Sequence, residues 1–398
     1  MAIKYILPEN WILYDPTKIL DQLVAARSAV QSLAETPYQR DWVEKLQQIQ
    51  LKMEVAGTSR IEGADFTERE LDAAMATAPN TQELITHSQR QAAAAAETYR
   101  WIANLPADTP ITDELVRQVH RRIVTGCDDD HCPPGVLRER DSNVTFGIPR
   151  HRGADGGEEC SVAFDRFLAA VRQHYRAHDP LIQALAVHYH LAAMHPFLDG
   201  NGRTARAIEA LLLRSAGLKT TTFIAMSNYY YDEKPKYLET LSACRAAGHD
   251  LTPFLYFGLR GVAQQCNRLL AEIRQNMAKA LFRNMMYDLF NRLITKRQRV
   301  IKDRQIELLK HLLSVDSADW QDLFLKSISI YHGVKNPAKA YQRDMSNLLN
   351  LGAVRIEKVA EKKWKVAVRL EWPSEITESA FFQKIKQMPK GKTYGFLP

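Results

Sequence analysis

The residues from His195 to Arg206 constrain this chain most, because they spell HPFLDGNGRTAR and lead directly into a helical pattern. Glycines on both sides of Asn201 let backbone N–H groups turn toward a bound anion without a Cβ in the way. The run from Thr204 to Gly217 has apolar residues at helical spacing and a glycine where a helix would end. The start of such a helix attracts phosphate through its free N–H groups and its dipole. The segment therefore predicts an anion-binding loop that opens a helix.

The side chains of the same segment suit phosphate transfer. Arg203 and Arg206 fall on one face of the first helical turn and can donate paired hydrogen bonds to phosphate oxygens. Asp199 offers the hard oxygen ligand that Mg²⁺ prefers, and His195 can act as a base near neutral pH. A base, a metal ligand and an anion cradle in one loop predict a phosphate-transfer site.

Two other groups of residues raise the question of a different metal. His188 and His190 lie two apart in a helical pattern, so their side chains point about 200° apart and cannot face one ion. We expect them to be core or surface histidines. A second group, Cys127, His131, Cys132 and Cys160, lacks a second ligand pair and contains a loop-like acidic run. Reduced thiols in a turn are the expectation there.

At this point the chain resembles a known family. HPFLDGNGRTAR is similar to the Fic signature, HPFx(D/E)GNGRxxR, at every fixed position, and Pro134 to Gly147 (PGVLRERDSNVTFG) resembles the flap of that family, which holds a target segment by strand pairing. The resemblance covers roughly residues 107–265. It implies a mainly α fold, with a helical core and a small β-hairpin flap. It also implies transfer of AMP from ATP to a Tyr, Thr or Ser hydroxyl of a target protein.

The resemblance also implies a role for each matching residue. His195 corresponds to the catalytic base, and Asp199 to the residue that holds Mg²⁺ between the phosphates. Tyr237 matches the first of a tyrosine pair near the adenine, but the second position is Leu238, which departs from the pattern. The implied nucleotide-binding residues are Asp199, Gly200, Asn201, Gly202, Arg203, Thr204, Arg206, Tyr237 and, in the flap, Val144, Thr145, Phe146 and Gly147.

An upstream motif predicts regulation of this site. Thr58 to Gly63 (TSRIEG) fits the inhibitory pattern of the family, (S/T)xxxE(G/N), with Thr58, Ser59 and Glu62 in the motif. A glutamate presented to Arg206 would form a charge-assisted pair and place negative charge where the γ-phosphate should lie. The alternative is a surface glutamate that makes a routine contact along its own helix.

The C-terminal part has a different pattern and charge. From Leu281 to Trp372 there are 18 Lys and Arg against 10 Asp and Glu, whereas the whole chain has 53 against 46, so the positive excess lies here. Helical patterns at 304–313, 319–330 and 336–351, followed by an alternating 354–370, predict a winged helix-turn-helix domain. DNA binding is one expectation, and protein docking or dimerisation is the alternative. The possible DNA-binding residues are Lys335, Lys339, Gln342 and Arg343.

The whole chain of 398 residues is too long for one core, and a helical stretch at 254–301 joins its parts. It contains no run of 18 apolar residues, so we expect no membrane partner. Its number of cysteines is odd, five, which favours a cytoplasmic protein. A homodimer is a further possibility that the family resemblance raises. We predict five segments: a helical region carrying the inhibitory motif (1–106), a catalytic core (107–265), a helical connector (266–296), a winged helix (297–372) and a tail (373–398).

Two other functions remain open from the sequence. One is a regulator that binds DNA or protein through residues 297–372 and modifies only itself. The other is a hydrolase that removes AMP from a modified target, with Glu62 orienting the water. The hydrolase would use the same residues as the AMP transferase, which works with Mg²⁺ and ATP, so the sequence leaves both directions open.

Overall fold

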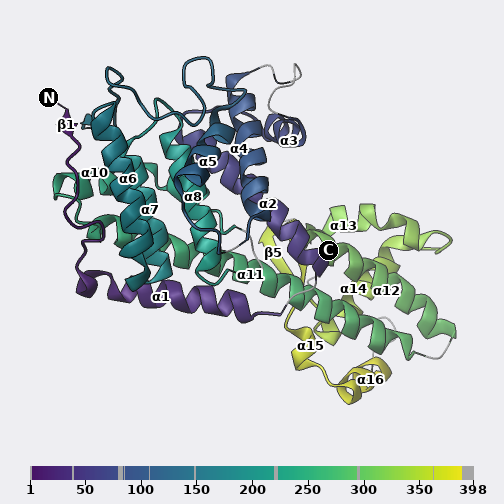
Figure 1. Ribbon diagram of the computed structural model, residues 1–398. Helices are drawn as coiled ribbons and strands as arrows, with labels where there is room; N and C mark the ends of the chain where they lie inside the picture. The colour runs from purple at the N-terminus through teal and green to yellow at the C-terminus, as the bar shows by residue number, and fades with distance from the viewer. Residues whose placement is uncertain are drawn as a thin grey trace. The chain divides into compact units, whose positions relative to one another are not determined.

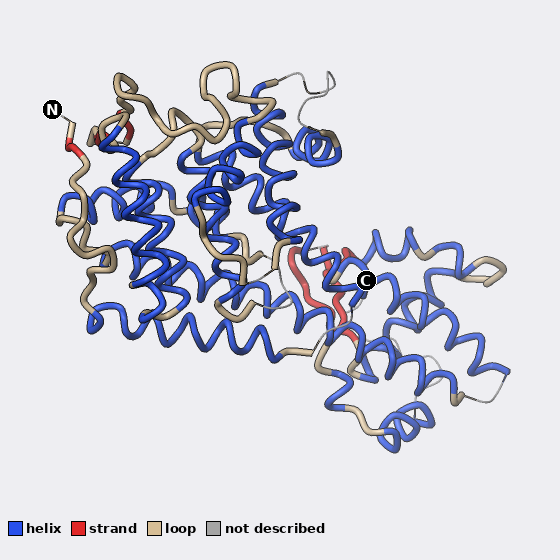
Figure 2. Tube along the Cα trace, viewed as in Figure 1, coloured by secondary structure: helices blue, strands red, loops and turns tan. Residues whose placement is uncertain are grey.

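The computed structural model describes residues 2–37, 40–78, 84, 86–106, 108–147, 149–218, 223–293, 296–361 and 363–387. The chain divides into two compact units, residues 1–271 and 272–398, and the boundary falls inside one long helix. The expectation of a mainly helical protein is confirmed, and the described strands belong to two small sheets (Figure 2). No helix in the described part of the chain is long and apolar enough to cross a membrane. The finer division into five segments stays a prediction.

The first unit is a helical assembly (Figure 1). Its helices are α1 (Pro16–Glu35), α2 (Arg40–Ile61), α3 (Glu68–Ala76), α4 (His87–Asn104), α5 (Asp113–Val124), α6 (Glu158–Gln173), the short 3₁₀ helix η1 (Tyr175–Ala177), α7 (Pro180–Met194), α8 (Asn201–Ser215), α9 (Met226–Asp232), α10 (Lys234–Ala246) and α11 (Thr252–Asn291), whose second part belongs to the other unit.

Helix α7 lies in the core of this unit because it is apolar on every side, which is typical of a fully buried helix. Its N-cap is Asp179, whose carboxylate accepts a hydrogen bond from the N–H of Leu181 at 2.8 Å, and Pro180 is the first helical residue. Helix α7 packs against α6 and α8, as Figure 1 shows. The loop predicted to bind an anion therefore joins two buried helices.

A small sheet lies beside this helical core. Strands β2 (Thr145–Phe146) and β3 (His151–Arg152) pair antiparallel, as the flap hairpin expected from the sequence requires. Strand β1 (Ile3–Lys4) pairs parallel with β3, so the strand order is β1-β3-β2. The sequence analysis had no signal for this addition of the N-terminal segment to the flap.

The second unit contains helices and one three-stranded antiparallel sheet with the order β4-β6-β5. Its core includes Leu312, Met345, Val366, Trp372 and Phe381, all nearly inaccessible to solvent. The elements are α12 (Lys296–Val315), β4 (Ser317–Asp319), α13 (Trp320–Lys326), the 3₁₀ helix η2 (Ile328–Tyr331), α14 (Pro337–Leu351), β5 (Val354–Ala360), β6 (Lys363–Val368), α15 (Trp372–Glu375) and α16 (Glu378–Gln387).

Two expected helices differ from the structure. The continuous helix expected at 254–301 is wrong, because α11 ends at Asn291 and α12 begins at Lys296. The helix expected at 319–330 is also interrupted, since α13 ends at Lys326 and a 3₁₀ turn follows. In that region Asp319 is instead the N-cap of α13, and its carboxylate accepts hydrogen bonds from two backbone N–H groups. Of the predicted tail, residues 388–398 lie outside the described residues.

Candidate active site

The loop between α7 and α8 is shaped by two left-handed residues. His195 ends α7 with φ 50°, and Gly200 precedes α8 with φ 69°. A Cβ on Gly200 would lie 2.7 Å from the Val124 side chain, so the position requires glycine. The Asn201 side chain closes the loop, because it accepts a hydrogen bond from the N–H of Phe197 and donates one to its carbonyl, both at 2.9 Å. The loop is therefore held in shape by its own contacts.

The imidazole of His195 is held in one tautomer. Its Nδ1 lies 2.5 Å from the carbonyl oxygen of Ala192, and a carbonyl only accepts, so Nδ1 carries the proton and Nε2 is left as a base. Burial lowers the pKa of His195 to about 4, which keeps the ring neutral at pH 7. On one face the ring stacks on Phe146 of the flap, with 3.6 Å between centroids and an interplanar angle of 6°. The expected base is thus neutral and oriented.

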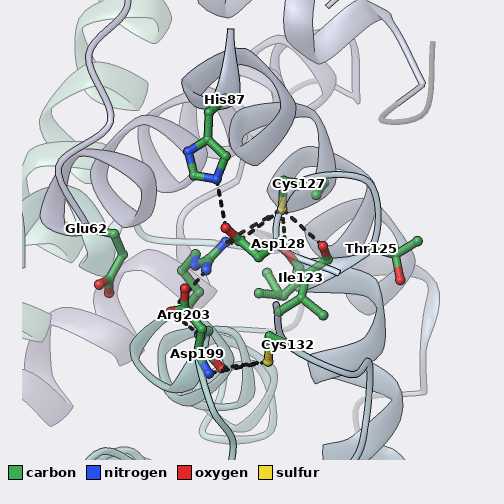
Figure 3. A network of polar contacts seen from close by, with 12 residues as sticks. Glu62, His87, Ile123, Thr125, Cys127, Asp128, Cys132, Asp199 and Arg203 are labelled. Atoms are coloured by element: carbon green, nitrogen blue, oxygen red, sulfur yellow. Dashed lines mark hydrogen bonds and ion pairs between the residues drawn. The ribbon is translucent and has the colours of Figure 1, made fainter. Parts of the chain in front are cut away.

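Arg203 is anchored by a buried carboxylate that the sequence analysis did not single out. Its Nη1 lies 2.6 Å from Oδ2 of Asp128, and both side chains are almost fully buried. Figure 3 shows Asp128 between Arg203 and His87, whose Nε2 lies 2.7 Å from Oδ1. The thiol of Cys127 also donates to Asp128 at 3.2 Å. Burial alone would raise the pKa of Asp128, but Arg203 outweighs it and lowers the value to about 2.

Three side chains of this region could hold a divalent cation. Asp128, His131 and Asp199 each offer a ligand atom, and these atoms lie within 4.8 Å of one another. Mg²⁺ prefers oxygen ligands to an imidazole nitrogen, so the two carboxylates fit the expected ion better than His131 does. Of these carboxylates, Asp199 is the one that the sequence predicted. The thiols of Cys127, Cys132 and Cys160 are buried and form no disulfide with the described cysteines. Cys132 instead accepts a hydrogen bond from the N–H of Asp199 at 3.3 Å.

A pocket of about 230 Å³ opens beside the loop. It is bordered by Gly202 and Arg206 of α8, by the flap and by one face of α10. Tyr237 of α10 is buried, and its hydroxyl lies 2.8 Å from Nε2 of His188 and 3.5 Å from Nη1 of Arg206. The lining residues are Ile61, Glu62, Phe146, Gly147, His151, Ala192, His195, Gly202, Arg206, Lys234, Tyr237, Leu238, Leu241, Ser242 and Arg245.

Comparison with known families matches residues 110–213 to the Fic/DOC family. This segment is a Fic domain. The protein adenylyltransferases Fic of Drosophila willistoni and Drosophila melanogaster are each 31% identical to the chain over 119 residues, which is 29% of this chain and 22% of theirs. The chain therefore spans about a fifth of the length of these relatives.

Two solved structures share the fold. A Fic family protein from Desulfovibrio desulfuricans G20 aligns with a TM-score of 0.55 at 15% identity, covering 92% of this chain and 98% of that one. Fic-1 (aa134–508) from C. elegans aligns with a TM-score of 0.54 at 16% identity, covering 65% of this chain and 74% of that one. At these identities the likeness concerns the fold alone.

An acidic residue from outside the Fic domain reaches its last helix. Glu62 follows α2, and its Oε1 lies 2.6 Å from Nη2 of Arg206. Thr58 adds two contacts to the same guanidinium, since its hydroxyl accepts from Nε at 2.9 Å and its carbonyl accepts from Nη2 at 3.2 Å. Glu62 is partly exposed, and although partial withdrawal from water would raise the pKa of its carboxyl, Arg206 and Arg203 lower it, so the carboxylate stays ionised at pH 7. The segment that carries the TSRIEG motif therefore engages both Nε and Nη2 of Arg206.

The approach of Glu62 depends on two glycines. A Cβ on Gly202 would lie 2.5 Å from Oε1 of Glu62, so the carboxylate sits where only glycine leaves room. Gly57, one turn earlier on α2, touches α9: a Cβ there would lie 2.4 Å from the backbone of Ser227 and Asn228. Buried Glu54 adds an acceptor for the N–H of Ser227 at 3.0 Å. These contacts seat the end of α2 over the Fic domain.

The predicted residues fall into two groups. The first group borders the pocket and consists of His195, Gly202, Arg206, Tyr237, Phe146, Gly147 and Glu62. The second group is Asp199 and Arg203, which contact each other, and Arg203 is also paired with Asp128. Other predicted residues touch neither. Ser59 is buried, and among the described residues its hydroxyl has no partner, which also holds for Thr204. In the flap, Val144 accepts a hydrogen bond from the N–H of Gly153, and Thr145 is exposed and bonds to Arg150.

Sequence reasoning missed Asp128 and Arg245. Asp128 lies 75 residues before Arg203 in an acidic run typical of a loop. Arg245 lies at the end of α10, eight residues after Tyr237. The helical spacing of Tyr237, Leu241 and Arg245 places them on one face, and that periodicity was the signal available for Arg245.

Proposed function

We propose that this protein is a nucleotidyltransferase that moves AMP from ATP to a hydroxyl group of a target protein and that Glu62 holds it inactive. The observation that carries the proposal is the neutral His195, whose unprotonated Nε2 can act as a base, at the pocket that Gly202 and Arg206 also border. The Fic domain and the relatives named protein adenylyltransferase support the reaction class.

In this proposal the target hydroxyl gives its proton to Nε2 of His195. The hydroxyl oxygen then forms a bond to the α-phosphorus, and the bond from that phosphorus to the bridging oxygen breaks, so pyrophosphate leaves. The guanidinium groups of Arg203 and Arg206 stabilise the negative charge that develops on the phosphates. A positioned base of this kind contributes about 10²–10⁴-fold to the rate.

A magnesium ion fits the donors that this site offers. Asp199 would hold it, with Asp128 and His131 close enough to support it. When bound, Mg²⁺ would neutralise phosphate charge next to the leaving pyrophosphate.

The inactive state follows from competition for Arg206. The carboxylate of Glu62 and a γ-phosphate are both anions that need the same guanidinium. Since Glu62 is part of the chain, it always occupies this position until α2 moves. A nucleotide that binds without Arg206 would have its α-phosphate in the wrong place for His195.

The test is auto-modification with α-labelled ATP and Mg²⁺, comparing wild type, Glu62→Gly and Glu62→Gly/His195→Ala. Labelling confined to the single variant supports the proposal. Equal labelling of wild type and Glu62→Gly would refute the inhibitory role, and labelling of the double variant would refute the role of His195. Release of AMP from a modified target, lost in Glu62→Gly, would instead favour the hydrolase.

A second candidate function concerns residues 297–372. Their order of helices, followed by the β5–β6 hairpin in a three-stranded sheet, is consistent with the winged helix that we propose for this segment. Lys335, Lys339 and Arg343 are exposed around the start of α14, the helix before the hairpin, which favours DNA binding, and Gln342 is partly buried beside them. Binding to duplex DNA that weakens steeply with salt would support this function, and no binding at low salt would refute it.

A further inference from the structure

Arg245 borders the pocket, and among the described residues its side chain has no polar partner. It comes from the last turn of α10, and its Nε atom is buried with no hydrogen-bond acceptor in the described part of the chain. None of the described carboxylates forms an ion pair with it. Its guanidinium lies over the ring of Phe146, whose centroid is 4.7 Å from Cζ.

This arrangement differs from that of the other two arginines of the site. Arg203 is paired with Asp128, and Arg206 with Glu62. Burial lowers the pKa of Arg245 to about 10, so it is still charged at pH 7. Arg245 is partly buried, and its Nε–H is withdrawn from water without an acceptor, which is costly and is compensated only in part by an aromatic face. Arg245 is therefore a donor group that a ligand can satisfy.

The position of Arg245 in the pocket indicates which part of a nucleotide it meets. Gly202 and Arg206 mark the phosphate end, and the Tyr237 hydroxyl lies 3.5 Å from Arg206. Arg245 follows Tyr237 by eight residues, a rise of about 12 Å along α10. Leu238, Leu241 and Phe146 also border the pocket and offer apolar surface for a planar base. With the phosphates at Arg206, the base lies toward Arg245.

The chemistry of a guanidinium then discriminates between bases. Arginine only donates hydrogen bonds, and its fork matches two neighbouring acceptors. Guanine presents O6 and N7, which are both acceptors, whereas adenine presents N7 beside an amino group that is itself a donor. Among the described residues that border the pocket, Glu62 is the one carboxylate, and it lies at the phosphate end, paired with Arg206.

We propose that Arg245 makes the pocket selective for a 6-oxopurine nucleotide, with GTP preferred over ATP, by donating paired hydrogen bonds to O6 and N7. This inference rests on the proposed function, because it requires a nucleoside triphosphate with its phosphates at Arg206. It replaces the expectation of ATP, which the resemblance to the Fic family implies, and with GTP as the donor the group transferred by the same site is GMP.

The test measures equilibrium binding by calorimetry in the full chain carrying Glu62→Gly and His195→Ala, so that Arg206 is free and no transfer occurs. GTP and inosine triphosphate, which share O6 and N7, should bind at least about tenfold more tightly than ATP. 7-Deaza-GTP, which lacks N7, should lose part of this advantage. Adding Arg245→Lys should bring GTP and ATP within about threefold of each other, because lysine keeps the charge but lacks the fork.

A matched control is Arg122→Lys in the same background. Arg122 also has a buried Nε without an acceptor among the described residues and lies over an aromatic ring, Trp101, at 4.6 Å, but it does not border the pocket. This variant should keep the GTP preference. The preference is a ratio of two affinities, so a general loss of folding in a variant would not produce the expected change.

The outcomes separate this inference from the proposed function. Equal or tighter binding of ATP, or a GTP preference that survives Arg245→Lys, would overturn the inference even if Glu62→Gly transfers AMP. A GTP preference that depends on Arg245 would support the inference even if no transfer is found. Failure of every nucleotide to bind would overturn both.

Discussion

The buried pair between Arg203 and Asp128 gives the sharpest test of how this site is held together. Both side chains are at most 2% exposed, and 2.6 Å separates Nη1 from Oδ2. Replacing Asp128 by Asn leaves the Arg203 charge buried beside a neutral amide. Breaking a buried pair by removing one partner typically costs about 3–5 kcal/mol. The asparagine retains an acceptor oxygen, so the loss should lie toward the lower end of that range.

The lowered pKa of Asp128 gives a second value for the free energy by which this pair stabilises the folded protein. Its value is held near 2, below the ordinary 3.8, and this difference corresponds to about 2 kcal/mol of stability at neutral pH. Because the folded-state pKa is the lower one, this stabilisation is complete above about pH 4 and is lost as the pH falls toward about 2. We therefore expect Asp128→Asn to cost about 2–4 kcal/mol at pH 7 and much less near pH 2.

Hydrogen exchange of peptides from α5 and α8 measures the free energy of opening for this part of the chain alone. The matched control is Asp129→Asn, which removes the same charge from the adjacent exposed position and should change that free energy by less than about 0.5 kcal/mol. If Asp128→Asn behaves like this control, Arg203 is not held by the buried carboxylate.

Three further predictions concern the rest of the molecule. Gly57→Ala places a Cβ against the backbone of α9, so it should destabilise the first unit by about 1–3 kcal/mol and raise auto-modification. Thermal unfolding measures the first effect and incorporation of labelled ATP the second, and no change in either would contradict the prediction. In Glu62→Gly, the transfer rate should stay constant from pH 7 to about 5.5, because His195 with a pKa of about 4 remains neutral there. With an ordinary pKa of about 6.5 the rate would fall about tenfold over this range, so a decrease near pH 6.5 in the pH–rate profile would contradict the lowered pKa. Trp372→Ala should destabilise the second unit by about 3–5 kcal/mol, measured by urea unfolding, since the ring is buried and its Nε1 donates to Leu351 at 3.0 Å; a loss below about 1 kcal/mol would contradict the packing.

Much of the site could be predicted because its main residues are consecutive. His195, Gly202 and Arg206 lie in one loop and one helical turn, so local geometry alone brings them together. The flap hairpin and the contact of Glu62 with Arg206 could not be predicted from local geometry. They were predicted from short motifs that resemble those of the Fic family. The helix expected at 336–351 was equally readable, and α14 runs from Pro337 to Leu351.

The parts that escaped prediction depend on contacts between distant segments. Asp128 and Arg203 are 75 residues apart, and nothing in an acidic loop says that one of its carboxylates is buried against an arginine. The same holds for the pairing of β1 with the flap, since two residues carry too little pattern to predict a strand. The end of α11 at Asn291 was missed because the helical pattern continues across the break.

The contact of α2 with Arg206 has a quantitative consequence for how activity can be set. An inhibitor that belongs to the same chain acts at a strength that does not depend on protein concentration. On the proposed mechanism, basal turnover measures the fraction of molecules in which α2 has left the guanidinium, and each change of about 1.4 kcal/mol in seating α2 alters that fraction about tenfold. Substitutions where α2 meets α9, remote from the reacting atoms, can therefore act as a graded control of output while the chemistry itself stays constant.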